Sequence, residues 1–570
     1  MSECRQQPKT RAKRVADLAW WKKLILGVFT ATFVLTLFEG CLWLLGVEPL
    51  LAERDPFVGF FSRVPHFEER AGVGHLPRMR TATNKLSYLN DQSFAVTKAE
   101  TAYRIFCLGG STTVGRPYGD GTSFVGWLRT LVDVAAPEQE FEVVNAGGVS
   151  YASYRVAALM EELIEFEPDL FVIYAGHNEF LEARTYHELR QSFAMRKWLT
   201  YAATQTRTAT LIDRLWQSAS AGPPAFKMSH EVKTILDETV GPTSYERDDV
   251  VRQDIVTHYE LSLRRMIDLA RSAGAYTVFV RPACNIRECS PFKSQPLDGL
   301  TARQHAACSE AFGRGQQYQQ QKRYAMAVDA FTEALAIDDR RADVHYQLGQ
   351  CLFALGRFEQ AKGALQQAAD EDVCPLRMTS DVGAALDRVV AERSVPMIDM
   401  QAILEQDCLR ESGHTVLGRE FFLDHVHLTI AAHGLLAAQL ATHLNDRGLL
   451  PQSIELSSQV WAEIERRVHS GIDADAHAKA EGNLARVLYW AGKVDEAGPL
   501  ALKCHSQLDD PRIFLIAGVY SLRNGETDRA LGFLRRAQQM APDDGRIRQV
   551  LETLGDTDAA PERENTSPPQ

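Results

Sequence analysis

Three residues of this chain have the types and spacing that acyl transfer needs. The stretch RIFCLGGSTTVG carries Ser111 just after an apolar run, and FLDHVHL carries Asp424 and His427 three residues apart. A serine hydroxyl becomes a nucleophile when a histidine takes its proton and a carboxylate fixes that histidine in one tautomer. We therefore expect Ser111 to attack, His427 to act as the base and Asp424 to orient it. His425 is the competing base, but the carboxylate-to-histidine spacing favours His427.

Other interpretations of these stretches are weighed against that chemistry. A serine after two glycines is commonly a turn residue or a helix cap, and this alternative stays open for GGSTTVG taken alone. A phosphate-binding loop would need G-x-x-x-x-G-K-[ST], and no lysine follows the second glycine. The stretches GHNEF and HVH lack the H-E-x-x-H spacing or paired cysteines of a zinc site. The sequence predicts neither a metal site nor a cofactor.

The elements that must position these residues alternate between strands and helices. Expected strands are RIFCLGG, FEVVNAGG, DLFVIYAG, YTVFVRP and VPMIDM, and expected helices are SFVGWLRTLVDVAA, SYRVAALMEELIEF, YELSLRRMIDLARSAG and TIAAHGLLAAQLATHL. Alternating strands and helices predict an α/β fold with a doubly wound, mostly parallel sheet. Such sheets bind ligands at the carboxyl ends of their strands, and the stretches GGST, NAGG, GHNE and FLDHVHL fall there.

The order of those four stretches resembles the SGNH, or GDSL-type, hydrolase family, over roughly residues 100–290 and 380–447. The resemblance implies a flavodoxin-like fold and the serine nucleophile and D-x-x-H pair already named. It also implies an oxyanion hole formed by the backbone amides of Ser111 and Gly147 and the side-chain amide of Asn178. We expect glycine at 147 because a side chain there would crowd the substrate. Two departures are G-G-S in place of G-D-S, and Glu179 where the family more often has aspartate.

An internal repeat interrupts the sheet pattern after YTVFVRP. Residues 34 apart match in kind, and the pairs are Phe312 and Tyr346, Gly315 and Gly349, Tyr318 and Leu352, Tyr324 and Phe358, Ala327 and Ala361, Phe331 and Leu365, and Ala334 and Ala368. This period, with small residues where paired helices must touch, resembles the tetratricopeptide repeat. A weaker array follows near the C-terminus, where Ala485, Ala497 and Ala501 are echoed by Gly518, Ala530 and Leu534.

The N-terminus carries a long apolar segment. Leu24 to Leu45 is a run of 22 residues with one charged side chain, which at about 1.5 Å per residue is long enough to cross a bilayer. Seven Lys and Arg residues but only two acidic residues precede it, so the positive-inside rule keeps the N-terminus in the cytoplasm. We expect an uncleaved single-pass anchor in the cytoplasmic membrane with the catalytic domain extracytoplasmic. Cleavage as a signal peptide and lipidation at Cys41 are the disfavoured alternatives.

These observations divide the chain into segments. We expect a cytoplasmic basic tail (1–23), a transmembrane helix (24–45), a stem (46–100), an SGNH hydrolase domain (101–300 and 376–447), inserted tetratricopeptide repeats (301–375), a C-terminal array of similar helices (448–555) and a disordered tail (556–570). The ten cysteines are dispersed. In an exported domain they permit disulfides, for which the expected candidates are Cys284, Cys289, Cys308, Cys374 and Cys408.

The sequence predicts a membrane-anchored serine esterase or deacetylase that works through an acyl-serine intermediate. Its expected partners are an acylated small molecule or glycan and, through the repeats, a protein. The net charge of −12 argues against nucleic acid. Two alternatives stay open, an O-acyltransferase acting on envelope or exported polysaccharide and a non-catalytic repeat scaffold with a vestigial hydrolase fold.

The topology is testable with a reporter. An enzyme that is active only outside the cytoplasm, fused after residue 60, should be active, because the basic excess before the apolar run holds the N-terminus inside. A reporter active only in the cytoplasm, fused at the same junction, should be silent. The reverse pattern would contradict the predicted anchor.

Overall fold

The computed structural model describes residues 20–53, 64–71, 77–181, 194–219, 245–451 and 453–554. The chain divides into two compact units, one formed by Met1–Phe61 with Gln191–Lys227 and the other by Ser62–Arg190 with Met228–Gln570. The predicted disordered tail and most of the predicted basic tail lie outside the described residues.

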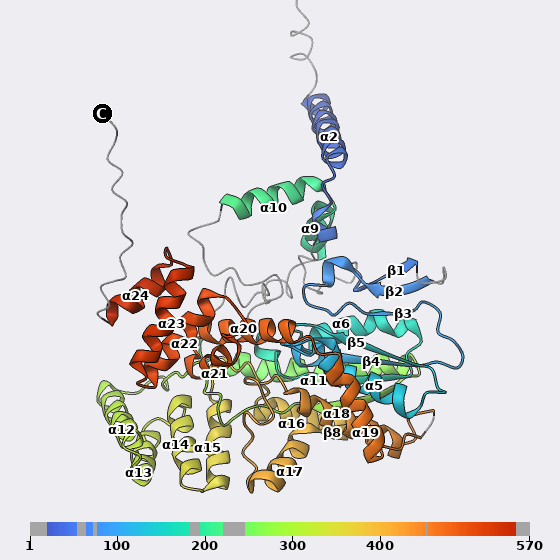
Figure 1. The fold of residues 1–570 in the computed structure, drawn as a ribbon. Helices are drawn as coiled ribbons and strands as arrows, with labels where there is room; N and C mark the ends of the chain where they lie inside the picture. Colours follow the sequence, from blue (N-terminus) through green and yellow to red (C-terminus); the bar gives the residue numbers. More distant parts are fainter. Residues whose placement is uncertain are drawn as a thin grey trace, which may run out of the picture. The chain divides into compact units, whose positions relative to one another are not determined.

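The described residues of the smaller unit form the helices α2 (Trp20–Leu44), α3 (Leu50–Glu53), α9 (Ala194–Thr204) and α10 (Arg207–Ala219) (Figure 1). Helix α2 is long and apolar enough to cross a membrane. Its Glu39 carboxylate accepts hydrogen bonds from the backbone amides of Arg207 at 2.9 Å and Thr208 at 2.8 Å. Those amides open α10, so Glu39 satisfies donors that the helix itself leaves unpaired.

The larger unit is built on a five-stranded parallel sheet, which confirms the predicted α/β fold class. Its strands are β4 (Tyr103–Gly109), β5 (Phe141–Gly147), β6 (Leu170–Tyr174), β7 (Tyr276–Arg281) and β8 (Met397–Asp399), and their spatial order is β5-β4-β6-β7-β8. This is the flavodoxin-like order, in which the first strand lies between the second and the third. The side of the sheet on which successive strands are added changes at β4, and Ser111 follows β4.

Helices cover both faces of this sheet. On one face lie α6 (Ser153–Leu163), α11 (Asp249–Ser272) and α16 (Ser380–Arg393), and on the other α5 (Phe124–Ala135), α17 (Met400–Ser412), α18 (Ile430–Asp446) and α19 (Ser458–Ser470). The second face holds the main apolar core, in which Ile105 and Cys107 of β4 contact residues of α5 and α18. Alternate β4 side chains point to this core because successive residues of a strand face opposite ways.

Part of the segment expected to be a stem belongs to the larger unit. It forms an antiparallel sheet of β1 (Phe67–Ala71), β2 (Pro77–Thr81) and β3 (Ser93–Ala95), followed along the chain by the main sheet. Among the described residues of this unit there are also single turns of helix, η2 (Thr83–Lys85), α4 (Ser111–Val114), η3 (Asp120–Thr122) and η4 (Ile164–Phe166). Residues 89–92 reach α4 and the end of β5, since Asn90 Nδ2 donates to Val114 O at 2.9 Å and Gln92 Oε1 accepts from the amide of Asn145. These hydrogen bonds therefore stabilise the elements that carry the predicted site.

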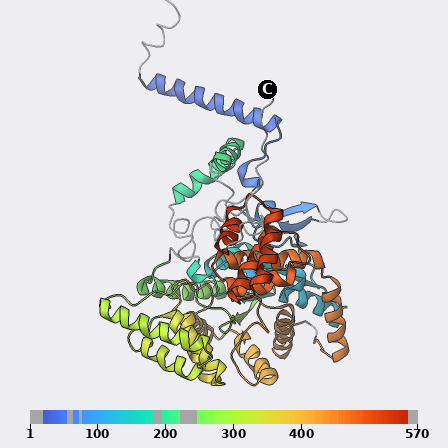
Figure 2. The same cartoon turned by 60° about the vertical axis from the view of Figure 1, so that its left-hand side comes forward.

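The inserted repeats form two helical hairpins, α12 (Ala302–Gln320) with α13 (Tyr324–Leu335), and α14 (Ala342–Ala354) with α15 (Phe358–Asp370) (Figures 1 and 2). A Cβ at Gly315 would come within 2.5 Å of the Phe331 ring, and one at Gly349 within 2.6 Å of Leu365 Cγ. Glycine is required at both positions because the paired helices pack too closely for a side chain. This explains the repeat read from the sequence.

The C-terminal array continues the same construction. Its helices are α20 (Ala474–Trp490), α21 (Val494–Cys504), α22 (Pro511–Arg523), α23 (Thr527–Met540) and α24 (Gly545–Thr553). A Cβ at Gly518 would lie 2.7 Å from Leu534 Cγ, which reproduces the close contact of the inserted hairpins.

The expectation of disulfides is corrected by the structure. Among the described residues four of the candidates, Cys284, Cys289, Cys308 and Cys408, are free thiols. They pack as small apolar side chains in separate parts of the unit, and burial raises the pKa of the Cys289 thiol to about 11.

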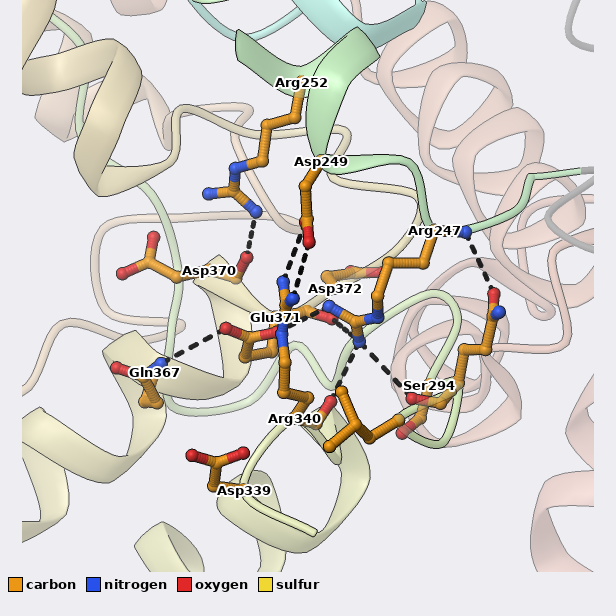
Figure 3. A network of polar contacts seen from close by, with 12 residues as sticks. Arg247, Asp249, Arg252, Ser294, Asp339, Arg340, Gln367, Asp370, Glu371 and Asp372 are labelled. Atoms are coloured by element: carbon orange, nitrogen blue, oxygen red, sulfur yellow. Dashed lines mark hydrogen bonds and ion pairs between the residues drawn. The ribbon is translucent and has the colours of Figure 1, made fainter. Parts of the chain in front are cut away.

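A polar network joins the second hairpin to the sheet domain (Figure 3). The Arg340 guanidinium contacts Asp249 at the start of α11 and Glu371 after α15, and Arg247 also reaches Glu371 at 2.6 Å. Beside them the buried Asp372 carboxylate accepts hydrogen bonds from the amides of Phe292 at 2.7 Å and Lys293 at 3.0 Å. The insertion is thus fastened to the loop after β7 by the buried Asp372 carboxylate and to the start of α11 by partly exposed ion pairs.

Asp372→Ala should lower the free energy of unfolding of the larger unit by about 2–3 kcal/mol, because it leaves buried amides without acceptors. Urea unfolding of the detergent-solubilised chain, followed by tryptophan fluorescence, measures this. The control is Asp339→Ala, which removes an exposed carboxylate close by in Figure 3 and should change the free energy by less than about 0.5 kcal/mol. Equal effects of the two substitutions would contradict the role given to Asp372.

Candidate active site

Ser111 is placed by a sharp turn at the end of β4. Gly109 has φ of 157°, and a Cβ there would lie 2.1 Å from the carbonyl oxygen of Tyr174 on β6. Gly110 then caps the single turn α4, whose first residue is Ser111. Both glycines are therefore needed so that the chain can leave the strand and present the serine at the carboxyl edge of the sheet. The sequence G-G-S, which replaces the G-D-S of the family pattern, is compatible with this turn.

His427 bridges the serine and the carboxylate. Its Nε2 lies 2.8 Å from Ser111 Oγ, and its Nδ1 lies 2.6 Å from Asp424 Oδ2. The serine and the histidine are 316 residues apart in sequence, yet all three side chains are within hydrogen-bond distance of a neighbour. This is the geometry in which the Nε2 atom receives the hydroxyl proton while Nδ1–H is held by the carboxylate.

The Asp424 carboxylate is buried and well supplied with donors. Its Oδ1 accepts from the amides of Val426 and His427, each at 2.8 Å. Burial pushes the pKa of Asp424 upward, but the adjacent His427 and His425 and the hydrogen bonds from His427 outweigh burial and hold the pKa well below its usual range. The group is therefore an anion that stabilises a protonated His427.

His425 does not occupy the position of the base. Its Nδ1 is 3.6 Å from Asp424 Oδ1, and that nitrogen is buried without a hydrogen-bond partner among the described residues. Burial lowers the pKa of His425 to about 3, which makes it neutral at physiological pH. His177, which precedes Asn178, is likewise buried, and its pKa is lowered to about 3. The choice of His427 over His425, made from spacing, agrees with the geometry.

Asn178 lies against the turn that carries the nucleophile. Its Nδ2 donates to Tyr151 O at 3.0 Å, and a Cβ on Gly110 would come within 2.6 Å of the same nitrogen. An amide nitrogen carries two hydrogens, so one remains for a ligand. Asn178 and Ser111 line the same cavity. The structure therefore brings Ser111, Asn178, Asp424 and His427 together.

Gly147 does not serve as an oxyanion donor in this geometry, and the reason expected for it is corrected. Its N–H donates to Asn145 Oδ1 at 3.1 Å. A Cβ there would lie 2.7 Å from the Val114 nitrogen and 2.9 Å from Thr113 Cβ. The glycine is thus required for packing against α4, and a side chain there would strike the protein before any substrate.

Ser150, three residues later, has the features expected of a donor in this loop. It lines the cavity and has φ of 62°, a conformation that favours glycine. The buried Arg155 guanidinium donates to Ser150 O at 2.9 Å, which holds this turn in place. Ser150 could not be predicted from the sequence, because a positive φ at a serine is set by its tertiary contacts.

Two supporting residues were missed at the sequence level. Glu179, noted only as a departure from the family pattern, is buried and accepts hydrogen bonds from Ser153 N at 3.0 Å and Ser153 Oγ at 2.7 Å. It therefore ties the loop after β6 to the start of α6. Asn145 Nδ2 donates to Thr113 O and to Asp120 Oδ1, both at 2.8 Å. It joins the loops after β4 and β5.

Ser111 and His427 open into a cavity of about 180 Å³. Loops of the sheet domain supply its polar lining, including Ser111, Asn178 and His427, and apolar side chains complete it. A concave, mostly apolar site with a few convergent polar groups is typical of small-molecule binding.

Comparison with known proteins confirms the tetratricopeptide repeats, and the solved structures that match have low identities and low TM-scores. The tetratricopeptide repeat family model matches residues 318–373, within the insertion. The acetylxylan esterase Axe2 from Geobacillus stearothermophilus matches with a TM-score of 0.28 and 13% identity, covering 63% of this chain and 100% of that one. A candidate acylhydrolase from Bacteroides fragilis matches with a TM-score of 0.27 and 10% identity, covering 62% and 91% respectively. The acetyl xylan esterase AlAXEase matches with a TM-score of 0.28 and 9% identity, covering 60% and 99%. No curated protein matches the chain.

Similarities at these TM-scores carry no functional argument, so the class of protein rests on the topology and the site. The sheet order, with Ser111 after its first strand, defines an α/β protein with a flavodoxin-like parallel sheet. Tetratricopeptide repeats are inserted between β7 and β8.

Acid should destabilise this unit through its buried neutral histidines. A folded-state pKa near 3, against about 6.5 unfolded, means that the unfolded chain binds more protons below pH 6.5. The free energy of unfolding is therefore highest above pH 6.5, and it falls as the pH drops toward 3. His425→Gln should reduce the slope of unfolding free energy against pH by about 1.4 kcal/mol per pH unit between pH 6 and 4.

The measurement is urea unfolding at a series of pH values. His433→Asn, on α18, is a second test, because burial also lowers the pKa of His433 to about 3, and it should give a similar reduction. An unchanged slope in both variants would contradict the assignment of neutral buried imidazoles.

Proposed function

We propose that this protein is a serine ester hydrolase that works through an acyl-serine intermediate at Ser111. The observation that carries the proposal is the continuous hydrogen-bonded series from Ser111 Oγ through His427 to Asp424, with distances of 2.8 and 2.6 Å. In a vestigial hydrolase fold nothing would preserve this alignment, so it favours the enzyme over the scaffold alternative.

In the proposed mechanism Ser111 Oγ attacks the ester carbonyl while His427 Nε2 takes the hydroxyl proton. The carbonyl oxygen becomes an oxyanion, for which the proposed donors are Asn178 Nδ2 and the backbone N–H groups of Ser111 and Ser150. The tetrahedral intermediate collapses, and His427 returns the proton to the leaving alkoxide. Water, activated by the same histidine, then attacks the acyl-serine and releases the acid. A sugar hydroxyl in place of water would make the same site an O-acyltransferase.

We further propose that α2 is an uncleaved membrane anchor and that the catalytic unit lies outside the cytoplasm. The length and apolar composition of α2 and the basic excess before it support this topology. The hydrogen bonds between Glu39 and the amides that open α10 also support an uncleaved α2, because cleavage after the apolar run would remove their acceptor.

Substitutions at the site should differ in magnitude. Ser111→Ala and His427→Ala should each lower kcat many thousandfold, and the double variant should be scarcely worse, because the two residues act as a unit. Asn178→Ala removes one oxyanion donor and should cost about 10²- to 10³-fold, and Asp424→Asn should fall between these limits. Hydrolysis of a small activated ester by the detergent-solubilised chain measures all four.

The matched control is Ser150→Gly, which keeps the backbone N–H and suits the positive φ, so it should retain most of the activity. Thermal unfolding of each variant separates catalytic loss from misfolding. Retention of more than about a tenth of the activity in folded Ser111→Ala would refute the proposed nucleophile.

A further inference from the structure

The wall of the catalytic cavity that comes from the C-terminal array is apolar. Helix α20 lines the cavity with Ala480, Leu484, Val487 and Leu488 among others, and Ala491 just after its end also lines it. The one amide that α20 contributes, Asn483, accepts a hydrogen bond from Arg486 one turn along the helix. The charged and hydrogen-bonding groups that line the cavity come chiefly from the sheet domain, so this wall offers few partners to a hydroxyl-rich ligand.

Helix α20 is fixed at both ends to loops beside the nucleophile. Near its start, Glu481 Oε1 accepts a hydrogen bond from Tyr118 OH at 2.6 Å, and the Tyr118 ring stacks on His477 with centroids 4.1 Å apart. Tyr118 follows Arg116 and Pro117, which also line the cavity. These contacts hold the first half of the helix over the turn that carries Ser111.

The other end is held by a buried cation. Lys493 Nζ, just after α20, donates to the backbone oxygens of Ser290 and Pro291, both at 2.6 Å. The same ammonium lies 4.5 Å from the centroid of the Phe292 ring, which lines the cavity. Three partners around one buried ammonium make this a defined attachment.

The array also packs against the loop of the catalytic histidine. Leu423, the residue before Asp424, packs on the apolar core of the array that includes Leu484 and Leu488. Those two leucines are therefore shared between the core of the array and the lining of the cavity. A displacement of α20 would alter the support of Asp424 as well as the shape of the cavity.

We infer that α20 is a wall of the active site and that the cavity takes the acyl chain of the substrate, apolar and longer than acetyl, against Leu484, Val487 and Leu488. This inference rests on the proposed function. An acetyl group bound at Ser111 would leave these side chains facing water, whereas each methylene placed against them gains hydrophobic free energy. The C-terminal repeats thus select the acyl group.

The test compares p-nitrophenyl acetate, butyrate, hexanoate and octanoate on the detergent-solubilised full chain. We expect kcat/KM to rise about fourfold per methylene from acetate to butyrate or beyond, as expected for burial of each CH₂ at an apolar wall. Ala480→Phe fills part of the cavity and should lower the hexanoate-to-acetate ratio at least tenfold.

The matched control is Ala476→Phe, one turn earlier on α20, where the alanine is exposed and does not line the cavity. It should leave the ratio unchanged. Ser111-dependent hydrolysis with acetate preferred, or the same ratio in wild type and Ala480→Phe, would overturn the inference and leave the proposed function standing. Failure to hydrolyse any ester in a Ser111-dependent way would overturn the proposed function, and the inference with it.

Discussion

One buried carboxylate sets the geometry of the whole site. Asp424 is only 3% exposed, and its two oxygens bind the amides of Val426 and His427 and the Nδ1 of His427. An anion taken out of water is stable only when its lone pairs are satisfied. The loop must therefore hold one conformation, and in that conformation His427 Nε2 faces Ser111 Oγ. A loop free to move would expose the carboxylate and separate the pair.

The positions of Ser111 and Asn178 depend on the parallel sheet. Because β5, β4 and β6 are parallel neighbours, the loops after them emerge at one edge, where Asn145 and Glu179 bind them to one another. Gly109 and Gly147 allow the backbones to approach within distances that a Cβ would prevent. The position of Asn178 beside the nucleophile follows from this close packing.

The helical repeats are part of the same construction. Asp372 and the arginine network fix the insertion to the loop after β7, and Lys493 fixes the C-terminal array to residues 290 and 291 of that loop. Both attachments therefore meet at one segment, which also supplies Phe292 to the cavity. Repeats are usually regarded as surfaces for partner proteins, but here both sets of repeats are attached to the segment that supplies Phe292 to the cavity.

The sequence by itself predicted the strands, the repeat period and the residues proposed as nucleophile, base and carboxylate, because local patterns encode these features. Alternating apolar runs give the parallel sheet, and small residues 34 apart mark helices that touch. Only the tertiary structure decided that Gly147 packs against α4, that Ser150 takes a positive φ, that four of the five candidate cysteines are free thiols and that α20 lines the cavity. Each of these depends on segments distant in the chain that meet only after folding. Residue type and spacing do not encode contacts between such distant segments. The residues proposed to react could therefore be predicted from the sequence, and the residues that surround them could not.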